Sequence, residues 1–130
     1  MASIFTRIIN RELPAYIVAE DDDHLAFLDV KPVKRGHLLV IPKKEIDYIF
    51  DMDDEALARL NAFAKKIAVA QKKAIPCKRI GTAVVGLEVP HVHIHLIPLD
   101  AIADLDFTKE RLTFSKEEYE SIRDSIKAEL

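Results

Sequence analysis

The sequence predicts an α+β fold, with an antiparallel sheet of about five strands, one long helix and short helices near the two ends. Three observations support this prediction. Residues 16–19, 24–28 and 37–41 are short apolar runs separated by turn-forming segments, which is typical of a meander of adjacent antiparallel strands. Residues 54–73 place apolar side chains at helical spacing. Residues 91–97 alternate histidine with branched apolar residues, which is the period of a half-buried strand.

The N-terminal part of the chain supplies the first helix and the three-stranded meander. Ser3 precedes apolar residues at positions 4, 5, 8 and 9, and therefore predicts a short helix with a serine N-cap. Pro14 lies beyond the end of this helix. An acidic turn over residues 20–23 separates the first two strands, residues 30–36 form a loop, and Pro42 ends the third strand.

The second half of the chain supplies the long helix, two more strands and a final helix. Aspartates at positions 51, 53 and 54 favour a helix start, because the helix dipole is positive at its N-terminus. Residues 78–85 and 91–97 predict the fourth and fifth strands. Ser115 and Glu118 form a capping box, which predicts a helix over about residues 115–128.

Length and composition limit the class of protein. A chain of 130 residues is long enough for its own core, so we expect a single domain over residues 1–130. The formal net charge of −3 argues against a nucleic-acid partner. The single cysteine, Cys77, is expected to be a structural thiol in a reducing compartment. Because no apolar run has signal-peptide or membrane-spanning length, we expect a cytoplasmic protein without a membrane partner.

The strand predicted over residues 91–97 carries most of the chemistry. Its period places His91, His93 and His95 on one face, in a row about 13 Å long. The row could be the polar face of an edge strand, although histidine is a poor strand former. It could also bind a metal, but the other ligands would have to come from elsewhere, and no CxxC or HExxH motif is present. A central imidazole that attacks as a nucleophile, oriented by its neighbours, suits three imidazoles on one face best.

The stretch from His91 to Pro98 resembles the signature of the histidine triad family of nucleotide hydrolases and transferases, in particular its adenosine phosphoramidase-like bacterial branch. The similarity extends over about residues 3–98, and the tail over residues 99–130 is not diagnostic. Further segments similar to the family are residues 4–9, Pro14, the acidic run 20–23, residues 26–30 and residues 36–43. The resemblance implies the α+β fold described above. It also implies a homodimer in which two sheets join edge to edge, with helices at the interface.

The resemblance assigns catalytic roles to four histidines. The residue that matches His93 attacks the α-phosphorus of a nucleotide and forms a covalent nucleotidyl-histidine, which water then hydrolyses. His95 would bind phosphate oxygens near the leaving group, and His91 would support the central histidine. His37 matches the fourth histidine of the family and would orient the others, although taken alone it is an ordinary structural histidine. His24, which follows three aspartates, is expected at the surface.

The resemblance also places a purine nucleotide in the site. Asp29 matches a residue that hydrogen-bonds the ribose hydroxyls, which suits a carboxylate. Glu88 is included because it precedes the triad closely enough to approach the substrate. The apolar residues that match positions around the purine base are Ile4, Phe5, Ile8, Leu13, Phe27 and Val30, each of which would pass as a core residue without the resemblance. No GxxxxGK[ST] or GxGxxG phosphate loop occurs, so histidines and backbone N–H groups must hold any phosphate.

The sequence departs from the family pattern at two places. Leu87 and Glu88 stand where glutamine followed by serine or threonine is usual, and leucine donates no hydrogen bond. Some members hold a structural zinc with two cysteines, a histidine and a triad histidine. The corresponding residues here are Ser3, Thr6 and Glu45, so we expect no structural zinc and no required cofactor.

Two hypotheses about function follow. The favoured one is a hydrolase that releases nucleoside 5′-monophosphate, of the AMP type, from phosphoramidates or from phosphoanhydrides such as dinucleoside polyphosphates. The departures at Leu87 and Glu88 predict weak activity, or a preference for single-phosphate nucleotides. The alternative is a purine-nucleotide-binding or regulatory module with little turnover.

Overall fold

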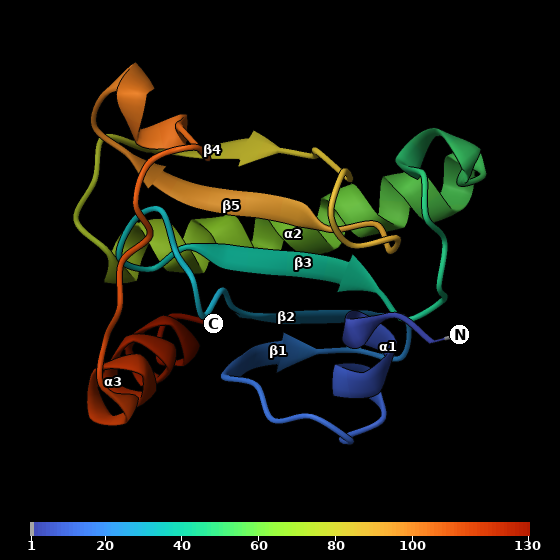
Figure 1. The fold of residues 1–130 in the computed structure, drawn as a ribbon, viewed down its shortest axis with the longest axis horizontal. Coiled ribbons are helices and arrows are strands. Elements are labelled where there is room, and N and C mark those ends of the chain that lie inside the picture. The colour runs from blue at the N-terminus through green and yellow to red at the C-terminus, as the bar shows by residue number, and fades with distance from the viewer. Residues whose placement is uncertain (1) are drawn as a thin grey trace.

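The computed structural model describes residues 2–130 and confirms the α+β class. Within these residues, five strands form an antiparallel sheet in the order β1-β2-β3-β5-β4, and Figure 1 shows them across the middle of the molecule. The strands are β1 (Ile17–Glu20), β2 (His24–Leu28), β3 (Leu38–Pro42), β4 (Arg79–Ala83) and β5 (Ile94–Leu99). The helices are α1 (Ile4–Ile9), α2 (Asp54–Ala74) and α3 (Lys116–Lys127), with 3-10 turns at η1 (Ile49–Asp51) and η2 (Ile102–Leu105).

Two helices cover the back of the sheet in this view. The long helix α2 runs behind β3 and β5 (Figure 1), and its apolar stripe, which includes Leu60, Phe63 and Ile67, packs on the sheet. The final helix α3 adds Ile122 and Ile126 to the same core. Both helices start with a side-chain cap, because Asp53 and Ser115 each accept a backbone N–H of the first turn, and the cap at Ser115 is the one that the sequence predicts. Apolar burial on this face is the main force that fixes the sheet.

The front of the sheet carries a second, smaller core under α1. Phe5 and Ile8 of this helix pack against Phe27, Leu39 and other apolar residues of β2 and β3. The side chain of Ser3 caps α1 by accepting the N–H of Thr6, as the sequence predicts. Because both faces are covered, β2 and β3 are buried along their whole length, which explains why these strands are continuously apolar.

Gln71 joins α2 to the sheet beneath the site. Its side chain is fully buried, and Nε2 donates to the carbonyls of Gly36 and Leu96 at 2.8 and 2.9 Å. Gly36 has φ +88°, a backbone conformation that glycine adopts without a steric penalty, and the turn that it closes delivers His37 to the start of β3. Within residues 2–130, the other polar atom of the Gln71 side chain, Oε1, has no hydrogen-bond partner. The helix therefore fixes the position of the β3 and β5 strands through hydrogen bonds as well as apolar contacts.

Two expectations from the sequence are wrong in detail. The last strand begins at Ile94 and not at His91, so the first two triad histidines precede the sheet. His24 is buried, with 6% of its surface exposed, because Nδ1 hydrogen-bonds the Asp21 carboxylate at 2.9 Å and the ring stacks on Phe63. The hydrogen bond to Asp21 and the packing on Phe63 of α2 together stabilise the buried imidazole.

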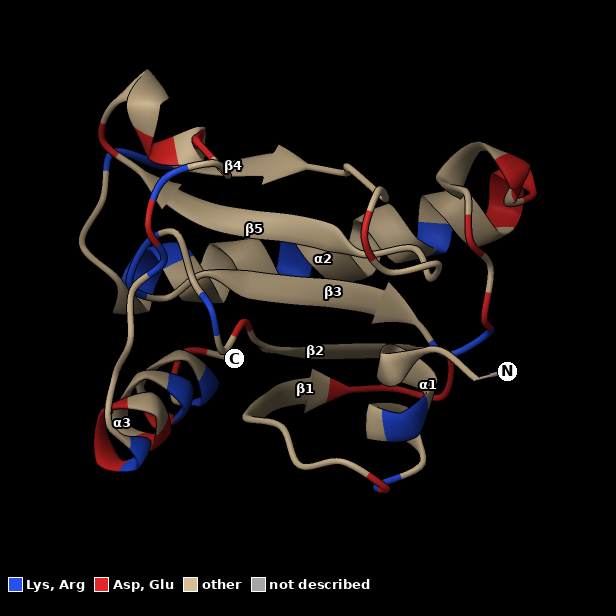
Figure 2. Cartoon of the chain, in the orientation of Figure 1, with Lys and Arg blue, Asp and Glu red and all other residues tan. Residues whose placement is uncertain are grey.

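Charged side chains lie mostly on the helices and loops, while the central strands carry almost none (Figure 2). No helix within residues 2–130 is both long enough and apolar enough to cross a membrane.

Candidate active site

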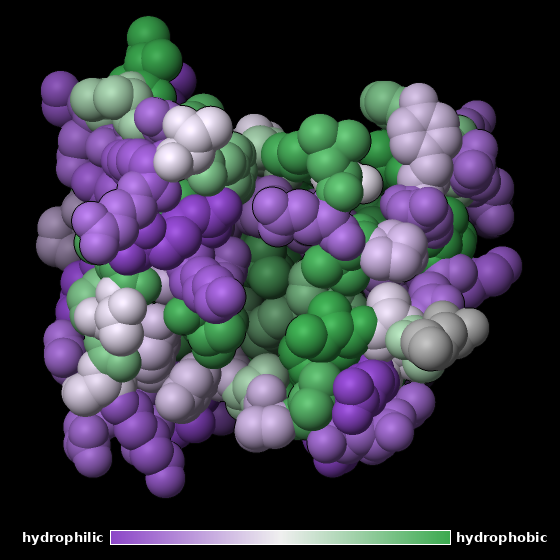
Figure 3. Space-filling model, viewed as in Figure 1, coloured by the Kyte–Doolittle hydropathy of each residue, from purple (hydrophilic) through white to green (hydrophobic). Residues whose placement is uncertain are grey.

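A cavity of about 620 Å³ opens on the front face of the sheet. Its walls come from α1, the end of β2, the segment 85–89 before the triad, and the tail after β5, and the largely buried His93 and His95 are among its lining residues. Figure 3 shows this face hollowed near its centre, with apolar residues in the hollow and hydrophilic residues along its left side. The sequence-predicted residues that line the cavity are Ile4, Phe5, Asp29, Val30, Glu88, His93 and His95.

The tautomer of His93 is fixed by the backbone. Its Nδ1 lies 2.7 Å from the carbonyl oxygen of His91, and because a carbonyl only accepts, Nδ1 must carry the proton. The other ring nitrogen, Nε2, is therefore unprotonated in the neutral imidazole. The ring of Phe5 packs edge-to-face against the imidazole, with ring centres 5.0 Å apart, and holds it in place. His93 is thus prepared as a nucleophile or a base that faces the cavity.

The tautomer of His95 is fixed by His37. The backbone N–H of Val33 donates to His37 Nδ1 at 3.1 Å, so the proton of this ring lies on Nε2. That N–H donates to His95 Nδ1 at 2.9 Å, which leaves the proton of His95 on Nε2. A ligand in the cavity therefore meets a lone pair on His93 and an N–H donor on His95, whose ring centres are 5.0 Å apart.

Burial keeps this pair of histidines neutral. It lowers the pKa of His37 to about 3 and that of His95 to about 4, and the neighbouring imidazoles and Arg111 add to both effects. Burial also lowers the pKa of His91. At neutral pH the neutral tautomers of His37 and His95 described above are therefore the populated forms.

His91 is fully buried and does not line the cavity. Its Nε2–H donates to the carbonyl of Pro42 at 2.8 Å, and its Nδ1 accepts from the hydroxyl of Ser3 at 2.8 Å. The residue acts on the site through its carbonyl oxygen, which holds His93. The three histidines thus do not form a uniform row, because one of them points away from the cavity into the protein.

Asp29 lies at the end of β2, where it lines the cavity beside the histidines. One carboxylate oxygen accepts the backbone N–H of Lys31 at 2.8 Å, and the other lies 3.6 Å from His37 Nε2. Burial raises the pKa of this carboxyl, and the negative charge of Glu88 raises it further. Asp29, His37 and His95 are close enough to share a metal ion, but the 2.9 Å hydrogen bond between the two imidazoles already uses Nε2 of His37 as donor and Nδ1 of His95 as acceptor.

Not every residue expected around the base reaches the cavity. Phe27 and Ile8 are buried in the core under α1, and Leu13 packs against the same core. These three side chains support the apolar wall that Ile4, Phe5 and Val30 present. Their fit to a purine base stays a prediction.

Sequence reasoning missed the contribution of the C-terminal tail. Phe107 and Arg111 both line the cavity, and the ring of Phe107 packs edge-to-face against His95 with centres 4.8 Å apart. The segment 99–114 has no helical or strand period that would have pointed to it. The sequence signal for a role in the cavity was the presence of Phe107 and Arg111 in a segment rich in charged residues.

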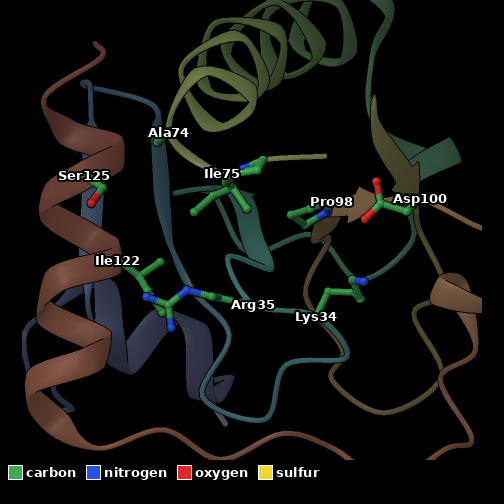
Figure 4. A pocket seen from close by; sticks show the side chains of 9 residues that line it. Lys34, Arg35, Ala74, Ile75, Pro98, Asp100, Ile122 and Ser125 are labelled. Carbon is green, nitrogen blue, oxygen red and sulfur yellow. The ribbon is translucent and has the colours of Figure 1, made fainter. Parts of the chain in front are cut away.

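A second cavity, of about 520 Å³, lies between α3, the end of α2 and the 34–35 turn (Figure 4). It contains none of the predicted site residues. Its two cations are already paired, Lys34 with Asp104 at 3.5 Å and Arg35 with Glu118 at 3.7 Å. Its one hydroxyl, that of Ser125, donates to the carbonyl of Ser121 at 2.8 Å, and its lining includes no imidazole to activate it, so the front cavity is the candidate active site.

Comparison with known proteins identifies the family. A family model described as the HIT domain matches residues 10–102. The chain belongs to the HIT family. An uncharacterized HIT-like protein from Borreliella burgdorferi is 44% identical over 102 residues, which cover 73% of each chain. The adenosine 5′-monophosphoramidase HNT1 of Saccharomyces cerevisiae is 38% identical over 98 residues, which cover 75% of this chain and 62% of the yeast protein. A HIT-like protein from Bartonella henselae, solved by crystallography, superposes with a TM-score of 0.85 at 34% identity, over 98% of this chain and 96% of that one.

Two features distinguish the site from the usual HIT pattern. At the position of the family glutamine, Leu87 is 88% exposed and lines the cavity with a side chain that cannot hydrogen-bond. Glu88 also lines the cavity, so its negative charge does face the site. A phosphate bound here would lack the usual amide donor and would meet a carboxylate.

The residues that match the zinc ligands of other HIT proteins form a hydrogen-bonded cluster. Glu45 accepts the backbone N–H of Ser3 at 2.6 Å and the hydroxyl of Thr6 at 2.7 Å, and these bonds lower its pKa to about 2. Ser3 in turn donates to His91. Two neutral hydroxyls and one carboxylate do not match the thiolate and imidazole ligands of a structural zinc. Here hydrogen bonds connect α1 to the triad.

Proposed function

We propose that this HIT family protein is a nucleotide hydrolase that releases nucleoside 5′-monophosphate, of the AMP type, through a covalent nucleotidyl-histidine on His93. The observation that carries the proposal is the fixed tautomer of His93, which presents an unprotonated Nε2 beside the N–H of His95. The relative HNT1 is an adenosine 5′-monophosphoramidase, which supports a phosphoramidate as substrate.

The reaction follows from the two tautomers. Nε2 of His93 attacks the α-phosphorus, the bond from phosphorus to the leaving nitrogen or oxygen breaks, and the leaving group takes the electron pair and a proton from solvent, which the attacking water returns to solvent in the second step. The imidazole ring gains positive charge, which the carbonyl of His91 stabilises through the Nδ1–H bond. His95 donates to a phosphate oxygen. Water then attacks the phosphorus, the P–Nε2 bond breaks, and the neutral His93 is restored with release of the monophosphate.

The position of the two carboxylates and the missing amide favour substrates with one phosphate, whose charge Lys31 and Arg111 in the same lining can balance. Glu88 and Asp29 both line the cavity, and Leu87 replaces the amide that would bind additional phosphate oxygens. We therefore expect an adenosine phosphoramidate to be hydrolysed faster than a diadenosine polyphosphate. The two substrates are compared by AMP release at equal concentration, and a clear preference for the polyphosphate would contradict this choice.

The exposed leucine also supports a second candidate function, a purine-nucleotide-binding module with little turnover. Leu87 is 88% exposed and provides no hydrogen bond at a position where the family pattern has a polar donor. The two functions are separated by AMP binding to the wild type and to His93→Ala. Equal binding with hydrolysis by the wild type alone supports the enzyme, whereas binding without any hydrolysis supports the module.

We also propose a homodimer that joins two sheets at β4. This strand is the last in the sheet order, so one of its edges has no strand beside it within residues 2–130. Val69 on α2 is 50% exposed and lines a shallow apolar depression with Ala68 and with Ile80 of β4, and Val84 just beyond β4 is 40% exposed. Light scattering is expected to give twice the mass of the chain, and Val69→Lys is expected to lower it.

A further inference from the structure

The tail after β5 returns to the cavity and forms one of its ends. The backbone N–H of Leu112 donates to the carbonyl of Pro32 at 2.9 Å, which attaches the tail to the loop after β2. Phe107 covers the triad side, with its ring 4.8 Å from His95 and 6.4 Å from His37. Arg111 lies next to it and also lines the cavity.

Neutral groups hold the guanidinium of Arg111 in place. Its Nη1 donates to the carbonyl of Lys31 at 2.8 Å and its Nη2 to the carbonyl of Phe107 at 3.2 Å, while the charge lies 5.6 Å from the centre of the Phe107 ring. These two bonds use two of the five N–H donors of arginine. Within residues 2–130 no carboxylate lies within ion-pair distance of Arg111, in contrast to Arg11 and Arg35.

A cation positioned by carbonyl groups keeps its charge available for a ligand. Arginine binds phosphate strongly because its planar donors match the phosphate oxygens. The cavity favours such a group, since Leu87 donates no hydrogen bond and the carboxylates of Asp29 and Glu88 line the same space, in which Lys31 is the other cation of the lining. The positive charge of Arg111 is close enough to lower the pKa of Asp29 and that of His95. These two residues are the ones expected beside the sugar and the phosphate of the nucleotide.

We propose that Arg111 binds the 5′-phosphate of the nucleotide, and that it replaces from the C-terminal tail the polar donor that is missing at Leu87. The inference rests on the proposed function for the identity of the ligand, and it adds a binding residue outside residues 10–102, which the HIT family model matches. It predicts that the protein distinguishes a nucleotide from its nucleoside chiefly through this residue.

Binding of AMP, 3′-AMP and adenosine to the wild type, Arg111→Gln and Arg111→Lys tests the proposal. Arg111→Gln should weaken AMP binding roughly ten- to a hundredfold, the effect of one charge-assisted hydrogen bond, with adenosine binding unchanged. Arg111→Lys should recover part of the loss. Lys109→Gln removes a charge from the same tail outside the cavity and should leave AMP binding unchanged.

Other results would overturn the proposal. Equal losses for AMP and adenosine would mean that Arg111 only maintains the shape of the cavity. A loss confined to 3′-AMP would place the guanidinium at the sugar edge, and unchanged AMP binding would remove its role altogether. The binding assay needs no turnover. Arg111-dependent AMP binding without hydrolysis would therefore contradict the proposed function alone, while hydrolysis with unchanged kcat/KM in Arg111→Gln would contradict this inference alone.

Discussion

The buried neutral histidines make the stability of this protein depend on pH in a predictable way. Burial lowers the pKa of His37 to about 3 and that of His95 to about 4, whereas both titrate near 6.5 in the unfolded chain. Between these values the unfolded state binds more protons than the folded state. The free energy of unfolding is therefore largest above about pH 6.5 and falls as the pH is lowered towards 4.

The size of this effect follows from the two shifts. Each pH unit below 6.5 costs about 1.4 kcal/mol per histidine, so at pH 5.0 each contributes a loss of about 2 kcal/mol and the two together about 4 kcal/mol. Hydrogen bonds from Ser3 and Thr6 lower the pKa of Glu45 to about 2. The contribution of Glu45 to the free energy of unfolding is therefore lost mainly at more acidic pH. The interval from pH 7.5 to 5.0 thus reports mainly on the histidines.

Urea unfolding at pH 7.5 and 5.0 measures the effect, and an equal m-value at both pH values confirms that the same transition is compared. His37→Gln should reduce the pH-dependent loss by about 2 kcal/mol, since its own contribution is gone while those of His95 and of His91, whose pKa burial also lowers, are kept. A loss below about 1 kcal/mol in the wild type would show that His37 and His95 are protonated without penalty. The tautomers on which the mechanism depends would then be wrong.

Two substitutions and one metal analysis test separate parts of the structure. Gln71→Leu keeps the side-chain volume but removes the hydrogen-bond donor of two buried carbonyls. It should therefore lower the free energy of unfolding, measured with urea, by roughly 2–5 kcal/mol. A loss below about 1 kcal/mol would contradict the role of Gln71 in joining α2 to the sheet. Glu45→Gln should lower kcat for AMP release with little change in KM, because the cluster positions His91 and does not touch the ligand, and an unchanged kcat would exclude that role. Metal analysis of the purified protein should find no stoichiometric zinc, and one zinc per chain would overturn the assignment of Ser3, Thr6 and Glu45 as a hydrogen-bonded cluster.

Local patterns were sufficient to predict most of the fold. The residues of β2, the Ser3 and Ser115 caps and the apolar stripe of α2 depend on neighbours close in sequence, and the structure has them where the sequence predicts them. His24 was misjudged because its burial depends on Phe63, which is distant in the chain. The strand at the triad starts later than alternation alone suggested.

The chemistry of the site depends on contacts between distant segments. Ser3 meets His91 across 88 positions, and Arg111 meets the carbonyl of Lys31 across 80. Such contacts decide which ring nitrogen of His91 and of His95 carries the proton and which cation faces the cavity, and no local period encodes them, whereas the tautomer of His93 is set by the carbonyl of His91 two residues away. For this reason the histidines were predictable as a group, whereas their tautomers and the contribution of the tail were not.

The most direct test of the central claim is mass spectrometry of the protein quenched during turnover of an adenosine phosphoramidate, with a chelator present, for the wild type and for His93→Ala. We predict that the wild type gains the mass of one adenylyl group on the peptide that contains His93 and releases AMP. The variant is expected to do neither while still binding AMP. AMP release by His93→Ala, or an adenylyl group on another residue of the wild type, would contradict the assignment of His93 as the nucleophile.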